Sequence, residues 1–525
     1  MNKFNKIWLV VTLLINGAAV MVLEILGTRI LSPFYGSTIF VWSSLISTAL
    51  AFLALGYWLG GKAVDRLHDK EFDLKIFKVK KITDLFVSIL FSAGIIFLII
   101  PKLDSIILIW TDSFGIRFGP LVASVIMFSI PLFLLGTISP IAIRYQTKDI
   151  GTVGMQSGRI FAIATVGSLV GALASGFFLI PNFSLSVIFS TTGALLIILA
   201  LGWLFAKRGG FTSIITIVLL IIIQFLLPSH VVSQPAQAKI IYKEQSYFGD
   251  IKLYELRAVN QNIRCLLIDT SSQSCWNYDI NSSAWPYTRY FRGAINAFPE
   301  DQKLDILILG LGGGAVVKEL SDTTHNVDIV EINPRIIELS TEFFDLPTTD
   351  NFTYIVQDAR YYVRHTDKKY DLIMIDIVIG SEPSIHMVTE EFFTEGKSIL
   401  KPNGILSTNA MGWIKSEDQQ PIVYNTLASV FSMVKFSVSN PDGYGSIVYF
   451  ASDREFVEQD FRGMIPNFFG RELLENHFTL SELPIFTDDY NPSYTLDIPT
   501  IVYGRNVTLE DFGYEFYLFE PNNEI

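Results

Sequence analysis

The chain has 525 residues, of which 50% are hydrophobic and 17% are charged, whereas an ordinary soluble domain has roughly 25% charged residues. This length exceeds what one hydrophobic core normally holds, so we expect at least two domains. The formal net charge of −12 argues against nucleic acid as a partner, because binding phosphates needs clustered basic residues. With only Cys265 and Cys275 present, we expect no metal site, and we interpret the two cysteines as unpaired thiols.

Residues 1–228 are predicted to form a multi-pass membrane domain. Seven apolar segments approach the roughly 20 residues that a helix needs to cross about 30 Å of hydrocarbon. They span residues 7–26, 39–61, 83–101, 119–137, 159–181, 184–206 and 211–227. Gly167 and Gly171 form a small-xxx-small pair, which predicts that two of these helices pack closely. We therefore expect an integral protein of the cytoplasmic membrane, with the lipid bilayer as a partner.

The second half of the chain is predicted to be soluble. Residues 229–241 are polar and are interpreted as a linker. Residues 242–300 are predicted to be a small β subdomain, because β-branched and aromatic residues alternate there around turn residues. From 301 to 525, short apolar runs alternate with helical stretches, which predicts a Rossmann-like α/β domain with a parallel, doubly wound sheet. The expected fold is therefore an α-helical membrane bundle followed by this α/β domain and its N-terminal β subdomain.

Two features at the start of the α/β domain predict a nucleoside site. The strand at 304–309 is followed by the run GLGGG, with Gly310, Gly312 and Gly314, which lets the backbone turn tightly and approach a ligand. The next strand ends in Glu331, 21 residues after Gly310. This is close to the spacing of about 20 expected for an acid that binds ribose hydroxyls.

Two later strands end in acids as well. The strand at 354–356 ends near Asp358, which is expected beside the adenine, and the strand at 372–375 ends in Asp376, which is expected beside the reacting group. The glycines do not follow the dinucleotide pattern G-x-G-x-x-G. This favours a ligand of the S-adenosylmethionine type, with plain NAD as the alternative.

Residues from about 242 to 450 resemble spermidine synthase, and the whole chain is similar to the fused group in which a multi-pass membrane part precedes such a domain. The motifs that carry this resemblance are the GLGGG loop, Val330-Glu331-Ile332-Asn333, Gln357-Asp358-Ala359-Arg360, Tyr370–Asp376, Thr389–Phe393, Leu400–Gly404, Pro383–Met387 and Thr487–Pro492.

The resemblance implies a donor, decarboxylated S-adenosylmethionine or S-adenosylmethionine itself, and a small-molecule acceptor, an amine or a lipid. It also implies site residues. The donor would contact Gly310, Gly312, Gly314, Glu331, Asp358, Ala359 and Asp376, and the acceptor would contact Gln273, Tyr287 and Arg289. A homodimer is compatible with the resemblance.

The sequence departs from the soluble enzymes where the acceptor should bind. The acid that follows the strand-four Asp by three residues is here Ile379, and the glycine loop has Gly313 in place of an Asp. The Tyr-His-Glu or Tyr-Gln-Glu run is here Tyr287-Thr288-Arg289, and the Gln from the β subdomain is here Gly249. A polyamine is a chain of ammonium groups, so fewer acids and an added Arg289 argue against putrescine as the acceptor.

The leading hypothesis is a membrane-bound transferase whose acceptor is neutral or anionic. Asp376, and on the following loop Glu382 and His386, are the candidate catalytic residues. A second hypothesis is true aminopropyl transfer to a polyamine, with the missing acids supplied from elsewhere in the fold. A third is a non-catalytic module that senses a nucleoside or polyamine and regulates a transporter-like membrane domain.

The side of the membrane on which the soluble domain lies is predicted in two conflicting ways. Lys and Arg cluster before the first apolar segment and after the second, fourth and sixth, which places those loops in the cytoplasm. Seven spans would then leave the residues after 228 outside. A donor of the S-adenosyl type is made in the cytoplasm, and for this reason we favour a cytoplasmic domain.

Overall fold

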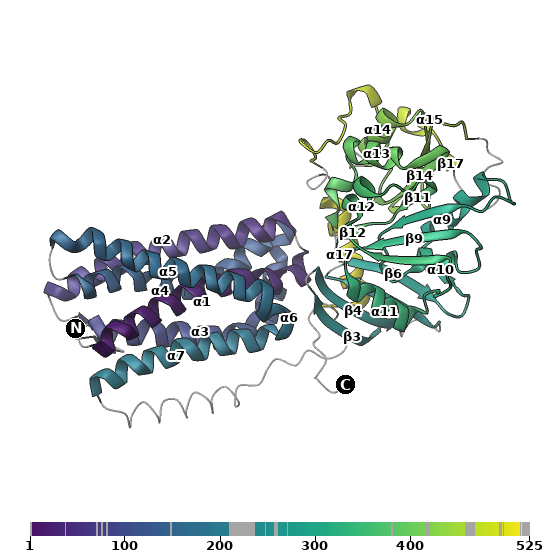
Figure 1. The fold of residues 1–525 in the computed structure, drawn as a ribbon. Helices are drawn as coiled ribbons and strands as arrows, with labels where there is room; N and C mark the ends of the chain where they lie inside the picture. The colour runs from purple at the N-terminus through teal and green to yellow at the C-terminus, as the bar shows by residue number, and fades with distance from the viewer. Residues whose placement is uncertain are drawn as a thin grey trace. The chain divides into compact units, whose positions relative to one another are not determined.

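The computed structural model contains two compact units, residues 1–233 and 234–517, which are described separately (Figure 1). It describes residues 3–208 and 237–516 except for short gaps at residues 37, 70–71, 75–76, 80–81, 148–149, 247, 257–260, 270, 380–381, 415–419, 457–467, 493–495, 497 and 515.

The first unit consists of long apolar helices. They are α1 (Lys3–Tyr35), α2 (Ile39–Asp69), α3 (Ile82–Thr111), α4 (Gly115–Gln146), α5 (Val153–Ala174) and α7 (Leu185–Arg208). The π-helical segment Ser175–Leu179 and the short α6 (Ile180–Asn182) follow α5, and a small hairpin of β1 (Phe72–Leu74) and β2 (Phe77–Val79) follows α2.

Among the described residues, five helical stretches are long and apolar enough to cross a membrane. One of them, Ile82–Gln146, contains both α3 and α4, which are joined by the 3-10 turn Asp112–Phe114. The predicted segment at 211–227 lies outside the described residues. These two facts account for the difference from the seven expected segments.

The predicted close contact at Gly167 and Gly171 is confirmed, and it joins α5 to α1. A Cβ atom at Gly167 would lie 2.1 Å from the carbonyl oxygen of Leu14, and one at Gly171 would lie 2.6 Å from Ala18. Because neither distance leaves room for a side chain, only glycine allows the two backbones to approach this closely.

The second unit begins with a five-stranded antiparallel sheet in the order β3-β4-β5-β6-β7. Its strands are β3 (Ala238–Ser246), β4 (Gly249–Leu256), β5 (Ile263–Ile268), β6 (Ser271–Asn277) and β7 (Ser282–Ser283). The predicted linker, residues 229–241, therefore extends too far, because β3 already begins at Ala238. Ala238 and Ile240 are buried with an exposed residue between them, so they pack as a half-buried strand.

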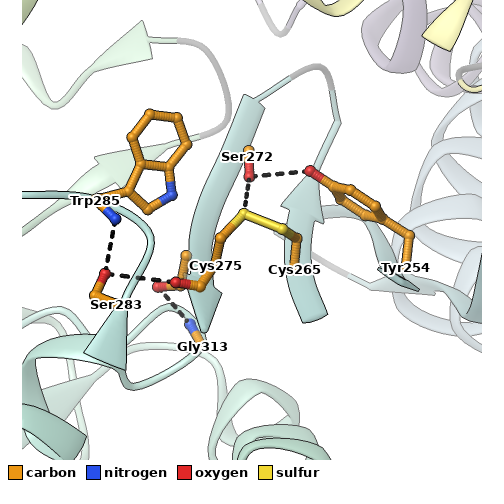
Figure 2. The surroundings of a disulfide bond; sticks show 8 residues. Tyr254, Cys265, Ser272, Cys275, Ser283, Trp285 and Gly313 are labelled. Carbon is orange, nitrogen blue, oxygen red and sulfur yellow. Dashed lines mark hydrogen bonds between the residues drawn. A yellow bond between two sulfur atoms is a disulfide. The ribbon is translucent and has the colours of Figure 1, made fainter. Parts of the chain in front are cut away.

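The expectation of two unpaired thiols is wrong. Cys265 on β5 lies directly opposite Cys275 on β6, and the two form a disulfide with their Cα atoms 4.1 Å apart (Figure 2). The pairing depends on the register of the hairpin, which places these residues face to face on neighbouring strands.

The larger sheet has the order β10-β9-β8-β11-β14-β16-β15-β17. The first five strands are parallel and the last three are antiparallel. They are β8 (Asp305–Leu309), β9 (Asn326–Glu331), β10 (Phe352–Val356), β11 (Tyr370–Ile375), β14 (Leu400–Gly412), β15 (Met433–Val438), β16 (Gly445–Ser452) and β17 (Phe468–Phe469). This order, with its reversal beside β8, confirms the Rossmann-like fold.

Helices and short strands precede, connect or follow the strands of this sheet (Figure 1). They are α9 (Tyr287–Gly293), α10 (Ala315–Glu319), α11 (Pro334–Phe344), α12 (Ala359–His365), β12 (Val378–Ile379), β13 (Glu382–Pro383), α13 (Glu390–Ser398), α14 (Gln420–Val430), α15 (Arg471–Glu475) and α17 (Ile498–Phe512).

Both faces of the sheet are buried. Along β8, Ile306 and Ile308 belong to one hydrophobic cluster, whereas Leu307 and Leu309 belong to another. Alternation along a strand sends successive side chains to opposite faces, so a strand with two buried faces is apolar throughout. This explains why the strands of the α/β domain are continuous apolar runs in the sequence.

Candidate active site

A cavity of about 810 Å³ lies along the carboxyl edge of the parallel strands, where open α/β sheets bind their ligands. The strand order sets its layout. One end, called here the glycine-loop end, is lined by Gly310, Gly312, Glu331, Asp358 and Ala359, from the ends of β8, β9 and β10. The other, called the β14 end, is lined by Asn409, Met411, Ser439, Tyr444, Ser446 and residues of α17. Asp376, at the end of β11, lies between them.

The glycine loop has the backbone that the sequence predicts. Gly310, Gly312 and Gly314 all have positive φ angles of 91°, 53° and 76°, a region that glycine adopts without strain. A Cβ atom at Gly310 would lie 2.3 Å from the carbonyl oxygen of Asp376. Gly310 and Gly312 line the cavity, whereas Gly314 is the N-cap of α10.

The absence of an Asp at Gly313 has a steric reason. A Cβ atom there would lie 2.9 Å from the Cβ of Ser274. The hydroxyl oxygen of Ser274 accepts a hydrogen bond from the backbone N–H of Gly313 at 3.0 Å. The strand β6 is therefore packed directly against the loop and occupies the space that a side chain would need.

Glu331 is held against the same loop. One carboxylate oxygen accepts a hydrogen bond from the N–H of Leu311 at 3.1 Å, and the other accepts one from the N–H of Asn333 at 2.8 Å. Burial raises the pKa of Glu331, although these backbone donors oppose the shift. The carboxylate thus lines the cavity in a fixed position.

Asp358 both caps a helix and lines the cavity. Its Oδ1 accepts a hydrogen bond from the N–H of Tyr361 at 2.7 Å and caps α12, as Asp commonly does at a helix N-terminus. The side chain is exposed and lines the cavity together with Ala359.

Asp376 is fixed by two donors from different elements. The hydroxyl of Tyr287 on α9 donates to Oδ2 at 3.0 Å, and the amide of Asn409 on β14 donates to Oδ1 at 3.2 Å. Burial raises the pKa of Asp376 to about 6, against the opposing effect of the two hydrogen bonds. A carboxylate with a pKa near neutrality is suited to accept a proton.

The structure does not bring all predicted acceptor residues into the cavity. Gln273 on β6 and Tyr287 line it. Arg289 does not belong to the lining: it is exposed on α9, and its guanidinium donates to the hydroxyl of Ser282 at 3.4 Å. The predicted repulsion of an ammonium by Arg289 therefore has no geometric basis.

The two candidate bases on the loop after β11 differ in position. His386 is exposed in a 3-10 turn, Ile385–Met387, and lines the cavity. Glu382 lies in β13, which pairs with β12 so that its backbone faces that of Ile379. Its side chain lies outside the described residues.

Arg360, from the motif that contains Asp358, stabilises the wall of the cavity. Its guanidinium donates five hydrogen bonds: two to Glu395, two to Asp488 and one to the backbone carbonyl of His386, at 2.7 to 3.0 Å. These hydrogen bonds also lower the pKa of Asp488. The Thr487–Pro492 motif therefore contributes an ion pair that fixes the loop carrying His386.

The sequence reasoning missed α17 as a wall of the cavity. Its residues Thr500, Ile501, Gly504, Arg505 and Thr508 line the β14 end. The spacing of Ile501, Gly504, Arg505 and Thr508 is that of one helix face, but a mixed polar face has no hydrophobic periodicity by which it could be recognised.

Comparison with known proteins relates this chain to one family. Residues 294–456 match the model of the spermine/spermidine synthase domain. The chain is 30% identical over 230 residues to a polyamine aminopropyltransferase of Sulfolobus acidocaldarius, covering 41% of this chain and 72% of that protein. It is 29% identical over 206 residues to a polyamine aminopropyltransferase of Vibrio vulnificus, covering 37% and 67%. A probable spermidine synthase from Corynebacterium glutamicum is a similar solved structure, with 20% identity, a TM-score of 0.42 and 48% and 98% coverage.

The strand order and the acid-lined cavity define the class of the second unit, a Rossmann-like domain of the methyltransferase type. The chain belongs to the polyamine aminopropyltransferase family, the spermine/spermidine synthases, and is a transferase of that class that also carries a unit of apolar helices.

Proposed function

We propose that the chain is a membrane-bound transferase that binds decarboxylated S-adenosylmethionine, or S-adenosylmethionine, and moves its alkyl group to an acceptor other than putrescine. The observation that carries this proposal is the position of Asp376 between the two ends of one cavity. Tyr287 and Asn409 hold its carboxylate there.

The glycine-loop end is where the donor would bind. Glu331 would accept hydrogen bonds from the ribose hydroxyls, and Asp358 would accept one from the adenine amino group. Gly310 and Gly312 line this end without side chains, so a ligand could approach their backbone closely. The family membership of this domain supports the assignment.

The transfer needs a nucleophile and a base. The lone pair of the acceptor forms a bond to the alkyl carbon while the carbon–sulfur bond breaks, and that electron pair converts the sulfonium to a neutral thioether. The nucleophile loses a proton, which Asp376 would accept because its pKa of about 6 leaves it ionised at neutral pH. His386, which also lines the cavity, is a second candidate base.

The charges on the cavity wall support an acceptor other than putrescine. In the described part of the chain, the lining carboxylates are Glu331, Asp358 and Asp376. Two of these lie at the glycine-loop end. Of the described carboxylates, a diamine at the β14 end would therefore meet Asp376 alone, and it would also meet Arg505.

The first test uses the purified full-length protein in lipid nanodiscs with decarboxylated S-adenosylmethionine. Release of 5′-methylthioadenosine in the presence of an acceptor is expected, and it should be lost in Asp376→Asn and retained in the exposed control Asp322→Asn. Efficient conversion of putrescine to spermidine would instead support ordinary aminopropyl transfer.

A second candidate function is a non-catalytic binding module that regulates the membrane unit. The observation that favours it is Ile379 at the position of the family's second acid. Tight binding of 5′-methylthioadenosine without turnover of any acceptor would favour this candidate over the transferase.

A further inference from the structure

The helix α17 forms the outer wall of the β14 end of the cavity. Ile501, Gly504, Arg505 and Thr508 follow one face of the helix at spacings of three and four residues, and all four line the cavity. A Cβ atom at Gly504 would meet no atom within 4 Å. The face of α17 therefore borders open space.

Aromatic contacts hold α17 in this position. The ring of Tyr503 lies 4.5 Å from that of Tyr444, just before β16, and 5.3 Å from that of Trp413, just after β14. The rings of Trp413 and Tyr444 are themselves 4.9 Å apart. Such ring pairs stabilise beyond the area that they bury, so the helix is anchored on the two strands that form this end.

A basic side chain, that of Arg505, lines the β14 end. Arg505 is only 7% exposed, and with His386 it is one of the two basic residues that line the cavity in the described part of the chain. A guanidinium offers several donors in a plane that match a carboxylate or a phosphate. Towards the centre of the cavity the facing charge is the carboxylate of Asp376.

We propose that Arg505 binds an anionic group of the acceptor, so that the acceptor is an amine carrying a carboxylate or a phosphate. The amine would lie at Asp376 and the anionic group at α17. This inference rests on the proposed transferase function. In the reaction, the amine nitrogen forms its bond to the alkyl carbon, the carbon–sulfur electron pair stays on the thioether, and the amine proton passes to Asp376.

Putrescine and 4-aminobutyrate form a matched pair for the test, because they have nearly the same length and differ in one terminal charge. Phosphoethanolamine and vesicles of phosphatidylethanolamine distinguish a free phosphate from a lipid headgroup. Full-length protein in nanodiscs should release 5′-methylthioadenosine at least tenfold faster with one of the anionic amines than with putrescine. Equal or faster release with putrescine would overturn the proposal.

Variants of Arg505 separate binding from catalysis. Arg505→Gln should raise the KM for the anionic amine about tenfold or more while kcat and binding of 5′-methylthioadenosine change little, and Arg505→Lys should restore part of the loss. The exposed Arg471→Gln serves as the control for losing an arginine. An unchanged KM in Arg505→Gln would contradict the proposal.

Gly504→Leu provides a second test if Arg505→Gln fails to fold. It adds a side chain where the structure has open space, so it should block the acceptor and leave binding of 5′-methylthioadenosine intact. Acceptor binding unaffected by this leucine would show that the β14 end is not the acceptor site. The protein could bind 5′-methylthioadenosine and yet form none of it from the donor with any acceptor. In that case the proposed function itself is wrong.

An independent observation concerns the disulfide. The side chains of Cys265 and Cys275 are 0% and 6% exposed, and the bond joins the two strands behind the cavity wall. Ser274, next to Cys275, accepts the hydrogen bond from Gly313, and the hydroxyl of Ser272 links Cys275 to Tyr254 (Figure 2). The disulfide thus stabilises the strand β6, which contacts the glycine loop through Ser274.

Disulfides persist in oxidising compartments and are rare in the reducing cytosol. The basic loops together with the seven spans predicted from the sequence would also place the residues after 228 outside. From the disulfide we infer that the second unit folds on the non-cytoplasmic side of the membrane, contrary to the side favoured from the donor alone. The donor would then have to reach the domain on that side.

The chain contains only these two cysteines, so their state can be read directly. Cells expressing the full chain are quenched with acid, and the protein is denatured and treated with a polyethylene-glycol maleimide, which labels free thiols. The protein should take up no label before reduction and two labels after reduction. The variants Cys265→Ser and Cys275→Ser should each show one label without reduction. Two labels in the unreduced wild type, or a cytoplasmic signal from a reporter fused after residue 525, would refute this inference.

Discussion

The hydroxyl of Tyr287 donates a hydrogen bond to the carboxylate of Asp376 at 3.0 Å. This contact joins α9, which follows the β subdomain, to the end of β11 in the larger sheet. It gives Tyr287, which also lines the cavity, a positioning role, because the tyrosine orients the group that we assign as the base.

Removing this hydrogen bond should change the pH dependence of the reaction. The bond favours the ionised form of Asp376, so Tyr287→Phe should raise the pKa of that carboxyl. The acidic limb of kcat, expected near pH 6 in the wild type, should move to higher pH. Rates of thioether release from pH 5 to 9 measure this, with Tyr290→Phe on the same helix as the control. An unmoved limb would mean that Asp376 is not the titrating base.

Replacing the carboxylate itself should have opposite effects on rate and stability. Asp376→Asn should reduce kcat by about 100-fold or more, since positioned bases contribute roughly 10² to 10⁴. The raised pKa of Asp376 means that it favours folding below pH 4 and loses this contribution as pH rises through about 6. The free energy of unfolding of the variant should therefore exceed that of the wild type by roughly 1–3 kcal/mol at pH 7 and be similar to it at pH 4. A variant less stable at pH 7 would contradict the assigned burial.

The carboxylate of Glu331 should contribute to donor binding more than to folding. In Glu331→Gln, the amide can replace only one of the two oxygen acceptors that bind Leu311 and Asn333, so folding should lose about 1 kcal/mol. Binding of 5′-methylthioadenosine, measured by calorimetry, should weaken at least tenfold. Glu338→Gln, on the exposed side of α11, should leave the affinity unchanged. Full affinity in Glu331→Gln would remove this residue from the nucleoside site.

The steric conflict at Gly313 gives a test of packing. Gly313→Ala places a methyl group 2.9 Å from the Cβ of Ser274, so β6 and the loop must separate. Thermal unfolding should show a loss of about 1–3 kcal/mol. Gly504→Ala meets no atom within 4 Å and lies inside a helix, where alanine should add about 0.5–1 kcal/mol. The two variants should move the melting temperature in opposite directions, and parallel shifts would show that the loop is less tightly packed than described.

The sequence predicted the features that depend on local pattern. Gly310, Glu331, Asp358 and Asp376 each follow a short apolar run, and a parallel sheet brings the ends of such runs to one edge. Their convergence on one cavity therefore follows from the sequence pattern.

Features that depend on register or on distant contacts could not be predicted in this way. The pairing of Cys265 with Cys275 follows from a hairpin register that is interrupted by a bulge. Arg289 follows a buried residue, Thr288, on a short helix. One step along a helix turns the side chain to a different face, and Arg289 therefore lies outside the cavity. Arg505 lies on a helix that has no conspicuous motif.

The ion pair between Arg360 and Asp488 has a consequence for synthesis of the chain. The two residues are 128 positions apart, and Arg360 is nearly buried. During translation Arg360 emerges well before its partner, so the partly made domain holds a buried guanidinium with two of its five hydrogen bonds unmade. The wall that carries His386 can become fully stable only after residue 488 has left the ribosome. Nascent chains stopped before that point should be open to proteases, and those stopped well after it should be resistant.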